Sequence, residues 1–227
     1  MKVTLISDTH NKHSLIPKDS LKGDIIIHSG DFSSLGHRHE CKDFLKWYNS
    51  LDYKYKVFIC GNHEVGVQKD PHMLTTLLIQ YPDLIYLNEE SVNIEGLNIY
   101  GSPWTPFFFN WAYNAQRGEE IKKHWDKIPN NTDILVTHGP VYGINDTVLG
   151  RPENLGCKDL YDKILEIKPL IHTCGHIHTG NGYKEFNDIN FFNTSVLDES
   201  YQMRYKPYHI EIEWEDGKPF INDITNG

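Results

Sequence analysis

Cysteine is scarce in this sequence, and its spacing argues against structural cross-links. The four cysteines, Cys41, Cys60, Cys157 and Cys174, are dispersed without a C-x-x-C pair. Cysteine-based zinc sites and disulfide frameworks are recognised by regular cysteine spacings, which this chain lacks. Free cysteines are most often small buried side chains. We therefore expect four reduced thiols, as is typical of a cytosolic protein.

Long apolar runs are also absent. The chain contains no stretch of about 18 consecutive apolar residues, and its first apolar run, at 3–6, is too short for the core of a signal peptide. It shows no internal repeat, low-complexity tract or linker. Single folds with sheets often reach about 200 to 250 residues. We therefore expect a cytoplasmic protein that does not interact with membranes and forms a single domain over residues 1–227.

Positive charge is in deficit. Lys and Arg total 22 against 31 Asp and Glu, which gives a formal net charge of −9. A negative surface field repels a long polyphosphate, so we expect no binding along duplex nucleic acid. The chain would remain acidic even with two divalent cations bound. A small anionic ligand that meets such cations directly fits this charge better.

The residues that are abundant predict an α/β fold. Hydrophobic residues make up 39% of the chain, and at this size about 70% of the unfolded chain's accessible surface is removed on folding. Such a core needs no metal for stability, so any metal site is expected to be catalytic. Short apolar runs predict buried strands at 2–7, 24–29, 54–60, 133–137, 169–173 and 189–193. Helical spacing lies between several of them, at 39–51, 71–80, 118–125 and 157–167.

Two further regions are rich in predicted strands. In the middle of the chain the runs at 84–87, 91–94 and 97–100 lie close together, and Glu95-Gly96 supplies a tight hairpin turn. Toward the C-terminal end, 182–186, 189–193 and 208–214 have the same character. We expect a mixed α/β (α+β) fold, in which a two-sheet β-sandwich is flanked by helices.

Nearly every predicted buried strand is followed by side chains that can bind metal. These five segments are 7–10 (Ser-Asp-Thr-His), 28–31 (His-Ser-Gly-Asp), 61–64 (Gly-Asn-His-Glu), 137–140 (Thr-His-Gly-Pro) and 175–178 (Gly-His-Ile-His). In open α/β sheets, ligand sites form beyond the carboxyl ends of the strands, so we expect these side chains to meet. Imidazole with carboxylate and amide oxygens suits first-row divalent ions such as Mn, Fe, Zn, Co or Ni.

The ordered blocks Asp-x-His, Gly-Asp, Gly-Asn-His-Glu, His and Gly-His-x-His resemble the calcineurin-like metallophosphoesterase superfamily. They span residues 8–178, about three quarters of the chain. An isolated histidine near a strand end has roughly one chance in ten of binding metal, but five ordered blocks reverse those odds. Residues 99–106, 138–140, 175–182 and 193–197 add a closer similarity to the metallophosphoesterase-domain-containing proteins of animal brain and their bacterial relatives.

The resemblance implies two divalent ions, with manganese favoured. One ion would be bound by Asp8, His10, Asp31 and His178, and the other by Asp31, Asn62, His138 and His176. Asp31 would bridge the ions, and a hydroxide between them would attack phosphorus. Two ions about 3.5 to 4 Å apart acidify that water and neutralise the phosphoryl oxygens. Some mammalian relatives replace the position of His176 with a smaller residue; this chain keeps it, so we expect both ions.

The resemblance also implies that His63 protonates the leaving group, work that suits an imidazole with a pKa near neutrality. Together with Asn62 it would contact substrate. The phosphatase branch of the superfamily commonly orients this histidine with an acid shortly after Gly-Asp, but residues 32–36 contain none. What orients His63 stays open, and activity on phosphoproteins is not expected.

Other aromatic residues and histidines receive weaker assignments. Trp104 lies in the aromatic segment 102–111 and is predicted to stack on a nucleobase. His28 and His172 lie inside strand patterns and are expected to be core residues. The remaining histidines are expected to be solvated, namely His13, His37, His39, His72, His124 and His209.

The resemblance implies a phosphodiesterase that acts on small substrates such as cyclic nucleotides. A nuclease or nucleic-acid end phosphatase is an alternative, which the acidic charge disfavours. A scaffold that keeps the fold without turnover is another, although such chains usually lose ligands and none is missing here. The metal pair that operates in the cell and the oligomeric state stay open.

Overall fold

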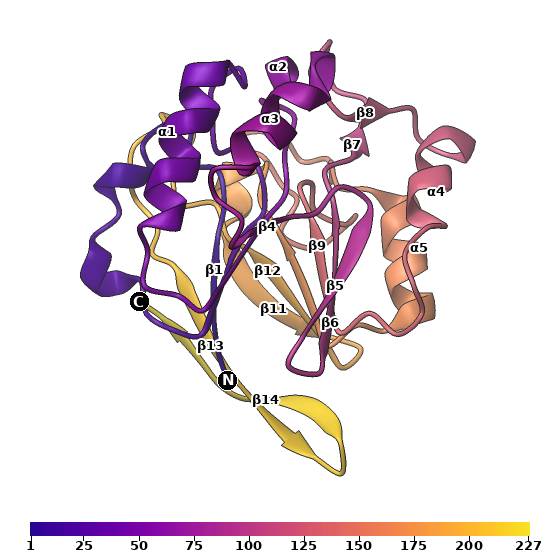
Figure 1. Ribbon diagram of the computed structural model, residues 1–227. Coiled ribbons are helices and arrows are strands. Elements are labelled where there is room, and N and C mark those ends of the chain that lie inside the picture. Colours follow the sequence, from indigo (N-terminus) through magenta and orange to yellow (C-terminus); the bar gives the residue numbers. More distant parts are fainter.

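Two six-stranded β-sheets lie face to face in the computed structural model, which describes residues 1–227 (Figure 1). Across the first sheet, the strands are β14 (Lys218–Asn226), β13 (Tyr208–Glu215), β1 (Lys2–Ile6), β2 (Ile25–His28), β3 (Tyr55–Phe58) and β4 (Leu84–Tyr86). Strands β1 to β4 run parallel. The β13–β14 hairpin continues the sheet antiparallel to β1.

The second sheet has the same parallel centre but an antiparallel strand at each edge. Across it, the strands are β11 (Gly182–Phe186), β12 (Ile189–Asn193), β10 (Ile171–Cys174), β9 (Ile134–Thr137), β6 (Leu97–Ser102) and β5 (Glu90–Ile94). The β5–β6 hairpin closes through Glu95 and Gly96, whose φ angles are 49° and 97°. Positive φ at both central residues is the requirement of the tight turn that the sequence predicts.

Helices cover the outer face of each sheet. The first sheet is covered by α1 (Arg38–Asn49), α2 (Val65–Lys69) and α3 (Pro71–Leu78), and the second by α4 (Glu119–Trp125) and α5 (Lys158–Ile167) (Figure 1). Phe44 of α1 packs in one cluster with Ile26 of β2, and Trp125 of α4 packs in another with Leu135 of β9. The layers therefore follow the order helix, sheet, sheet, helix.

The alternation of side chains along each strand explains this layering. In β2, Ile25 and Ile27 join the cluster between the sheets, whereas Ile26 joins the cluster under α1. In β9, Ile134 and Val136 face the other sheet, and the residue between them faces the helices. Successive side chains of a strand point to opposite faces, so a continuous apolar run is buried on both sides.

The predicted fold class is confirmed, and every predicted strand and helix is present with bounds within two residues. The smaller elements left no signal in the sequence; they are α2, β7 (Thr105–Pro106), β8 (Asn114–Ala115), β14, and the 3-10 helices η1 (His13–Leu15), η2 (Lys18–Ser20) and η3 (His178–Gly180). Strand β14 was missed because it pairs only with β13 and none of its side chains is fully buried.

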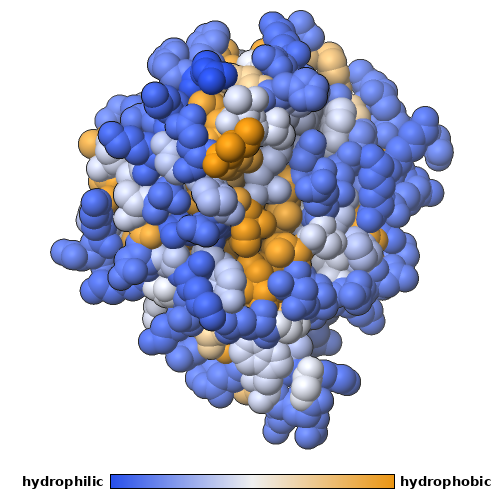
Figure 2. Space-filling view, viewed as in Figure 1, coloured by the Kyte–Doolittle hydropathy of each residue, from blue (hydrophilic) through white to orange (hydrophobic).

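Edge strands β4 and β5 border the same side of the sandwich. A hydrophobic streak with hydrophilic margins runs over this region (Figure 2). Ile85 of β4 and Val92 of β5 are only partly buried and pack against the cluster between the sheets. The inter-sheet core therefore reaches the surface here. None of the helices combines the length and apolar character that crossing a membrane would require.

Candidate metal centre

The loops that follow five parallel strands converge at one end of the sandwich. Asp8 and His10 follow β1, Asp31 follows β2, Asn62 follows β3, His138 follows β9, and His176 and His178 follow β10. Three groups of their side chains have potential ligand atoms within 4.8 Å of one another, namely Asp8–His10–His178, His10–Asp31–His63 and Asp31–His138–His176. The structure therefore brings together the side chains that the sequence singles out.

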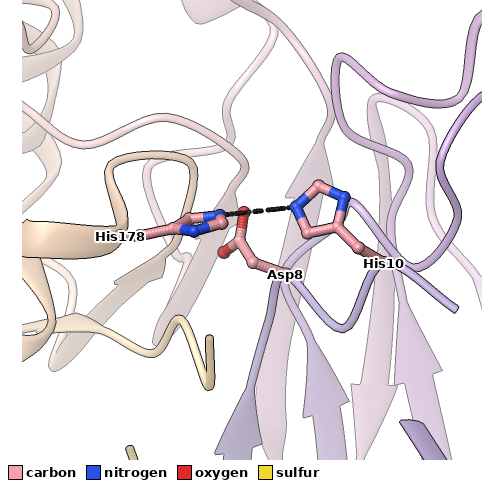
Figure 3. A group of neighbouring side chains, drawn as sticks. All are labelled: Asp8, His10 and His178. Atoms are coloured by element: carbon pink, nitrogen blue, oxygen red, sulfur yellow. Dashed lines mark hydrogen bonds and ion pairs between the residues drawn. The ribbon is translucent and has the colours of Figure 1, made fainter. Parts of the chain in front are cut away.

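The first group lies at the junction of the two sheets (Figure 3). The Nε2 atoms of His10 and His178 are 3.3 Å apart, and Oδ1 of Asp8 is 3.9 Å and 3.5 Å from them, respectively. Both rings turn these nitrogens toward the carboxylate. Two imidazole nitrogens and one carboxylate oxygen thus point into the same small space, as ligands of one divalent ion do.

Asp31 lies between this group and the next one. Its Oδ2 is 3.8 Å from Nε2 of His10 and 3.2 Å from Nε2 of His138. The same nitrogen of His138 is 2.9 Å from Oδ1 of Asn62, and the rings of His138 and His176 are 5.1 Å apart. One carboxylate therefore borders both sets of candidate ligands, which is the position that a bridging ligand needs.

Main-chain carbonyls orient three of the histidines and determine which ring nitrogen carries the proton when the ring is neutral. Nδ1 of His10 lies 3.2 Å from the carbonyl oxygen of Ser33, and Nδ1 of His138 lies 2.9 Å from that of Ser29. His178 makes the same contact, at 2.9 Å, with the residue 198 carbonyl. A carbonyl oxygen only accepts, so Nδ1 carries the proton and the neutral ring leaves Nε2 free as a ligand.

The backbone of these loops is strained where it carries ligands. Asp8, His10, Asp31 and His176 have φ angles of 54°, 40°, 55° and 67°, in the left-handed region. Each such residue costs about 1 to 3 kcal/mol, and residues of this kind cluster at functional sites. The left-handed turn follows the strand at once, so the side chain stays at the sheet edge.

Two glycines leave room for the carboxylates. A Cβ atom on Gly175 would lie 1.9 Å from Oδ2 of Asp8, and one on Gly61 would lie 2.4 Å from Oδ1 of Asp31. These distances are far below any tolerated contact, so another residue would displace the carboxylates. The Gly-His and Gly-Asn pairs of the sequence are therefore explained by close packing against Asp8 and Asp31.

The charges in the cluster are mutually dependent. Burial raises the pKa of Asp8 and Asp31, but His178 beside the first and His138 beside the second outweigh it and lower both pKa values. Burial opposes the charged forms of His138 and His178, but their carboxylate partners raise the pKa of each to about 9. Without metal, two protons thus balance the two carboxylates. Cations that bind here must displace them.

The remaining two histidines are already in their binding state. Burial lowers the pKa of His10 and of His176 to about 4, and the two nearby carboxylates offset this only in part. Both rings are therefore neutral at pH 7. The donor set as a whole, with ionised carboxylates, neutral imidazoles and an amide oxygen, fits divalent first-row metals.

Comparison with known proteins agrees with this geometry. The family model described as calcineurin-like phosphoesterase matches residues 1–188. The chain belongs to the calcineurin-like phosphoesterase family. It is 35% identical to metallophosphoesterase domain-containing protein 1 of Homo sapiens, over 91% of this chain and 69% of that protein. It is 32% identical to a UPF0046 protein of Caenorhabditis elegans, over 96% of this chain and 83% of that protein.

Solved structures share the fold at low sequence identity. The crystal structure of TT1561 of Thermus thermophilus matches with a TM-score of 0.65 and 11% identity, over 99% of this chain and 98% of that one. Another matches with a TM-score of 0.70 and 15% identity, over 92% and 94%. Family membership and the cluster of His and Asp side chains are consistent with a metal-dependent phosphoester hydrolase.

Within this calcineurin-like phosphoesterase, a main-chain carbonyl contacts His63. Its Nδ1 lies 2.9 Å from the carbonyl oxygen of Ser34, and its ring is stacked on Trp111 with centroids 4.3 Å apart. Its Nε2 lies 3.9 Å from Oδ2 of Asp31, at the edge of the cluster. The sequence lacks an acid at 32–36, and the carbonyl of Ser34 takes that place. Such a contact depends on the path of the backbone and leaves no signal in the sequence.

Glu40 anchors the loop that presents this carbonyl. Its carboxylate accepts hydrogen bonds from the backbone nitrogens of Ser34 and Leu35, both at 3.2 Å, and from that of His37 at 2.8 Å. It also accepts one from Nδ2 of Asn11 at 2.6 Å. The first turn of α1 thereby holds the segment that faces His63.

Glu64 connects two of the strand-end loops through hydrogen bonds. This fully buried carboxylate accepts hydrogen bonds from the backbone nitrogens of Gly61, Asp31 and Ser33, at 2.6, 3.1 and 3.0 Å, and from the Ser33 hydroxyl at 2.7 Å. Burial, reinforced by the charge of Asp31, raises its pKa to about 8. Glu64 is therefore a structural part of the site and makes no contact with the cavity.

A cavity of about 440 Å³ opens beside the cluster. Besides His10, Asp31, Asn62, His63, His176 and His178, it is lined by an outer rim that includes Phe107, Phe108, Trp111, Arg117, Arg151 and Tyr201. The rim residues lie in loops, and the β7–β8 pair closes the loop that carries the first three. The backbone nitrogen of Ala112 in that loop donates to the carbonyl of Asn62 at 3.0 Å.

Trp104 does not line this cavity. Its ring is stacked on His124 with centroids 3.7 Å apart and lies edge-on to Tyr113. It packs against the hydrophobic clusters under the helices. The prediction that Trp104 lies at the site is therefore wrong. Trp111, seven residues later in the same aromatic segment, lines the cavity instead and is stacked on His63, in the loop closed by the β7–β8 pair.

The other histidines follow the expectations only in part. His28 and His172 are fully buried and bonded to Thr9 and Thr137 through their hydroxyls, as core residues. Burial lowers the pKa of each to about 3. His37, His39 and His72 are exposed as predicted. For the others the prediction is wrong, because His13 is buried against Trp47 and Asp43, His124 bonds Glu89, and His209 bonds Thr4.

Proposed function

We propose that the protein is a phosphodiesterase that hydrolyses small phosphodiesters, such as cyclic nucleotides, with two divalent metal ions. The observation that carries this proposal is the position of Asp31, whose carboxylate borders both groups of candidate ligands. A site for a single ion would need no such shared carboxylate. Two cations that share a carboxylate lie close enough to stabilise both the attacking and the leaving oxygen of an in-line displacement at phosphorus.

The contacts support the two ligand sets that the family resemblance implies. Asp8, His10, Asp31 and His178 would hold one ion, and Asp31, Asn62, His138 and His176 would hold the other. When bound, the ions supply a nucleophile at neutral pH and neutralise the phosphoryl oxygens, and manganese suits these ligands. The residues of the chain then have to orient the diester and deliver a proton to the group that leaves.

His63 is placed to deliver that proton. Its Nδ1 faces the carbonyl of Ser34, which only accepts, so the exchangeable proton of the charged ring is on Nε2. Nε2 faces the edge of the cluster near Asp31, and the ring lines the cavity. Stacking on Trp111 limits rotation of the ring. A departing alkoxide next to Nε2 would take the proton as its bond to phosphorus breaks.

The cavity and the charge favour a small substrate. Small-molecule sites usually have volumes of about 300 to 1,000 Å³, and this cavity of about 440 Å³ lies within that range. Phe107, Phe108 and Trp111 offer faces on which a nucleobase could stack, worth about 1 to 3 kcal/mol per base. The net charge of −9 disfavours a long nucleic acid.

The test is turnover of bis(p-nitrophenyl) phosphate by the manganese-reconstituted protein. Asp31→Asn should lower kcat/KM by at least about 1,000-fold, because it weakens both ligand sets, and His63→Ala by about 100-fold. His72→Ala, which changes an exposed histidine on α3, is the matched control and should leave kcat/KM unchanged. Absence of turnover with any divalent metal would instead favour a scaffold with this fold.

The substrate class needs a separate assay. Cyclic mononucleotides and single-stranded oligonucleotides should be compared at equal phosphodiester concentration. We expect kcat/KM to be at least about tenfold higher for the cyclic mononucleotides, given the acidic surface and the small cavity. Faster cleavage of oligonucleotides would contradict the proposal and indicate a nuclease.

A further inference from the structure

Tyr201 reaches the cavity from a segment that carries no motif in the sequence. It lies in the loop between β12 and β13, beyond all predicted ligands, and lines the cavity. Its ring centroid is 4.9 Å from that of His10 and 5.4 Å from that of His178, with interplanar angles of 76° and 77°. Tyr201 thus touches both histidines of one proposed ligand set.

The loop is fastened so that this ring stays in place. The main-chain carbonyl of Asp198 contacts Nδ1 of His178 at 2.9 Å. The side-chain Oδ1 of Asp198 accepts hydrogen bonds from the backbone nitrogens of Ser200 and Gln202 at 2.9 and 3.0 Å. Lys12, two residues after His10, donates through Nζ to the carbonyl of Tyr201. The loop is therefore held by contacts with the segment after β1 and with the segment after β10.

The backbone of Tyr201 is itself unusual. Its φ is 56°, in the left-handed region, which is a genuine outlier for a bulky residue. Such strain persists only where the surroundings determine it, and it gathers at functional sites. The strained residue is thus also the one whose ring contacts His10 and His178.

The hydroxyl of Tyr201 is available for a ligand. It has no hydrogen-bond partner within the chain, and the residue is 41% exposed. A phenol hydroxyl donates a single hydrogen bond, which suits an oxygen that remains negatively charged through the reaction. The oxygen of the leaving group needs a proton transferred to it, which an imidazole does better. His63 already occupies that role in the proposed function.

We propose that Tyr201 is a substrate-contacting residue whose hydroxyl donates a hydrogen bond to a non-bridging oxygen of the scissile phosphate. This inference rests on the proposed function and deepens it. His10 touches both rings, with His63 at 4.5 Å and Tyr201 at 4.9 Å between centroids. Both donors therefore contact His10 and line the cavity, with His63 serving the leaving group and Tyr201 the phosphoryl group.

Tyr201→Phe removes the hydroxyl and keeps the ring, so it tests the hydroxyl alone. The variant keeps the contacts with His10 and His178, so metal content and thermal midpoint should match the wild type. Across aryl phosphodiesters that differ in leaving-group pKa, it should lower kcat/KM by about tenfold and by the same factor for every substrate. The loss in His63→Ala should instead grow as the leaving group becomes poorer. Tyr142→Phe is the matched control, because Tyr142 is 47% exposed and outside the cavity lining.

Binding of inorganic phosphate gives a second measurement that needs no turnover. Calorimetry on the manganese-loaded protein should show a Kd about fivefold higher for Tyr201→Phe than for the wild type and Tyr142→Phe. If kcat/KM and the phosphate Kd of Tyr201→Phe were both within twofold of the wild-type values, this inference would be overturned. The proposed function would still stand in that case, provided that His63→Ala is impaired. A loss in Tyr201→Phe that grows with leaving-group pKa would also overturn this inference. A wild-type protein that neither takes up metal nor hydrolyses diesters would overturn both proposals.

Discussion

Side chains that would hold metal and side chains on the outer rim of the cavity come from different parts of the fold. Asp8 and Asp31 directly follow parallel strands and are 0% and 2% exposed. Phe107 and Tyr201 on the cavity rim come from loops and are 53% and 41% exposed. In the first region Asp8 accepts hydrogen bonds from Ser7, His176 and Ser195, and Asp31 accepts one from the backbone nitrogen of His63 and lies 3.2 Å from Nε2 of His138. In the second region Tyr201 is held through its backbone carbonyl by Lys12.

We expect the sheet edge to determine whether the reaction occurs and the rim to determine which substrate is accepted. The sheet edge fixes the charge and spacing of the candidate ligands, so changes there should affect metal binding, stability and turnover together. The rim would determine what fits beside ions bound there, so changes in the rim should alter individual kinetic constants and leave metal binding intact. Loops commonly carry such variable functions on a rigid scaffold. Substitutions in each region test this division of roles. We expect the largest effect from substitutions at the strand ends.

Glu64→Ala should damage the strand-end region most. It removes the acceptor for hydrogen bonds from Gly61, Asp31 and Ser33, and it leaves those donors buried. We expect the free energy of unfolding of the metal-free protein to fall by about 3 to 5 kcal/mol, measured by urea denaturation.

Glu40→Ala is the matched comparison. Glu40 also accepts several backbone hydrogen bonds, but it lies at the first turn of α1, nearer to solvent. Loss of this capping interaction should cost about 1 kcal/mol. If the two variants lost equal stability, the distinction between the buried strand ends and the outer loops would fail.

Metal uptake at the strand ends should release protons. His138 and His178 have pKa values of about 9 in the metal-free protein, so both are protonated at pH 7. Binding of two ions should therefore release about two protons per chain, measured by calorimetry in buffers of different ionisation enthalpy. Apparent affinity for the metal pair should rise by about 100-fold per pH unit below pH 9. Uptake without proton release would show that these carboxylate–imidazole pairs do not form.

The same pairs set the pH dependence of stability without metal. The pKa values of His138 and His178 are raised above the unfolded value near 6.5. Their stabilisation is thus fully present below about pH 6.5 and is lost as the pH rises through 9. The thermal midpoint of the metal-free protein should fall between pH 7 and pH 10, and bound manganese should remove most of that decline.

Trp111→Ala tests the rim. Loss of the stacked ring should free His63 and lower kcat for poor leaving groups by about tenfold, and it should raise KM for a cyclic nucleotide more than for bis(p-nitrophenyl) phosphate. Metal content should not change. Trp104→Ala is the matched control, because Trp104 is stacked on His124, packs against the core clusters and does not line the cavity.

Trp104→Ala should lower thermal stability and leave kcat and KM near wild-type values. Trp111→Ala that lost metal together with turnover would show that the rim and the metal centre are one unit. Equal effects of the two substitutions on KM would remove the case for base stacking at Trp111.

The two regions also differ in how far the sequence predicted them. Buried strands were evident from apolar runs, and the ends of parallel strands must meet at one edge, so Asp8 and His138 could be placed together although 130 positions separate them. Their roles as ligands stay predictions from family resemblance. The strength of that prediction came from the order of the five segments, because no single histidine would have justified it.

The rim could not be predicted because its residues depend on loop paths. Trp104 and Trp111 are equivalent in the sequence, and only the β7–β8 pair decides which one faces His63. Tyr201 lies in a segment without any motif, where the left-handed turn that aims its ring is a tertiary effect. The partner of His63 is a backbone carbonyl, which every residue possesses.

In the proposed function, one carboxylate, from Asp31, joins two metal ions. Electron paramagnetic resonance of the manganese-reconstituted protein, with metal content measured on the same sample, tests it most directly. We predict two Mn(II) ions per chain with an exchange-coupled spectrum, and loss of that coupling in Asp31→Asn. One ion or none per chain, or two ions with independent spectra, would contradict it.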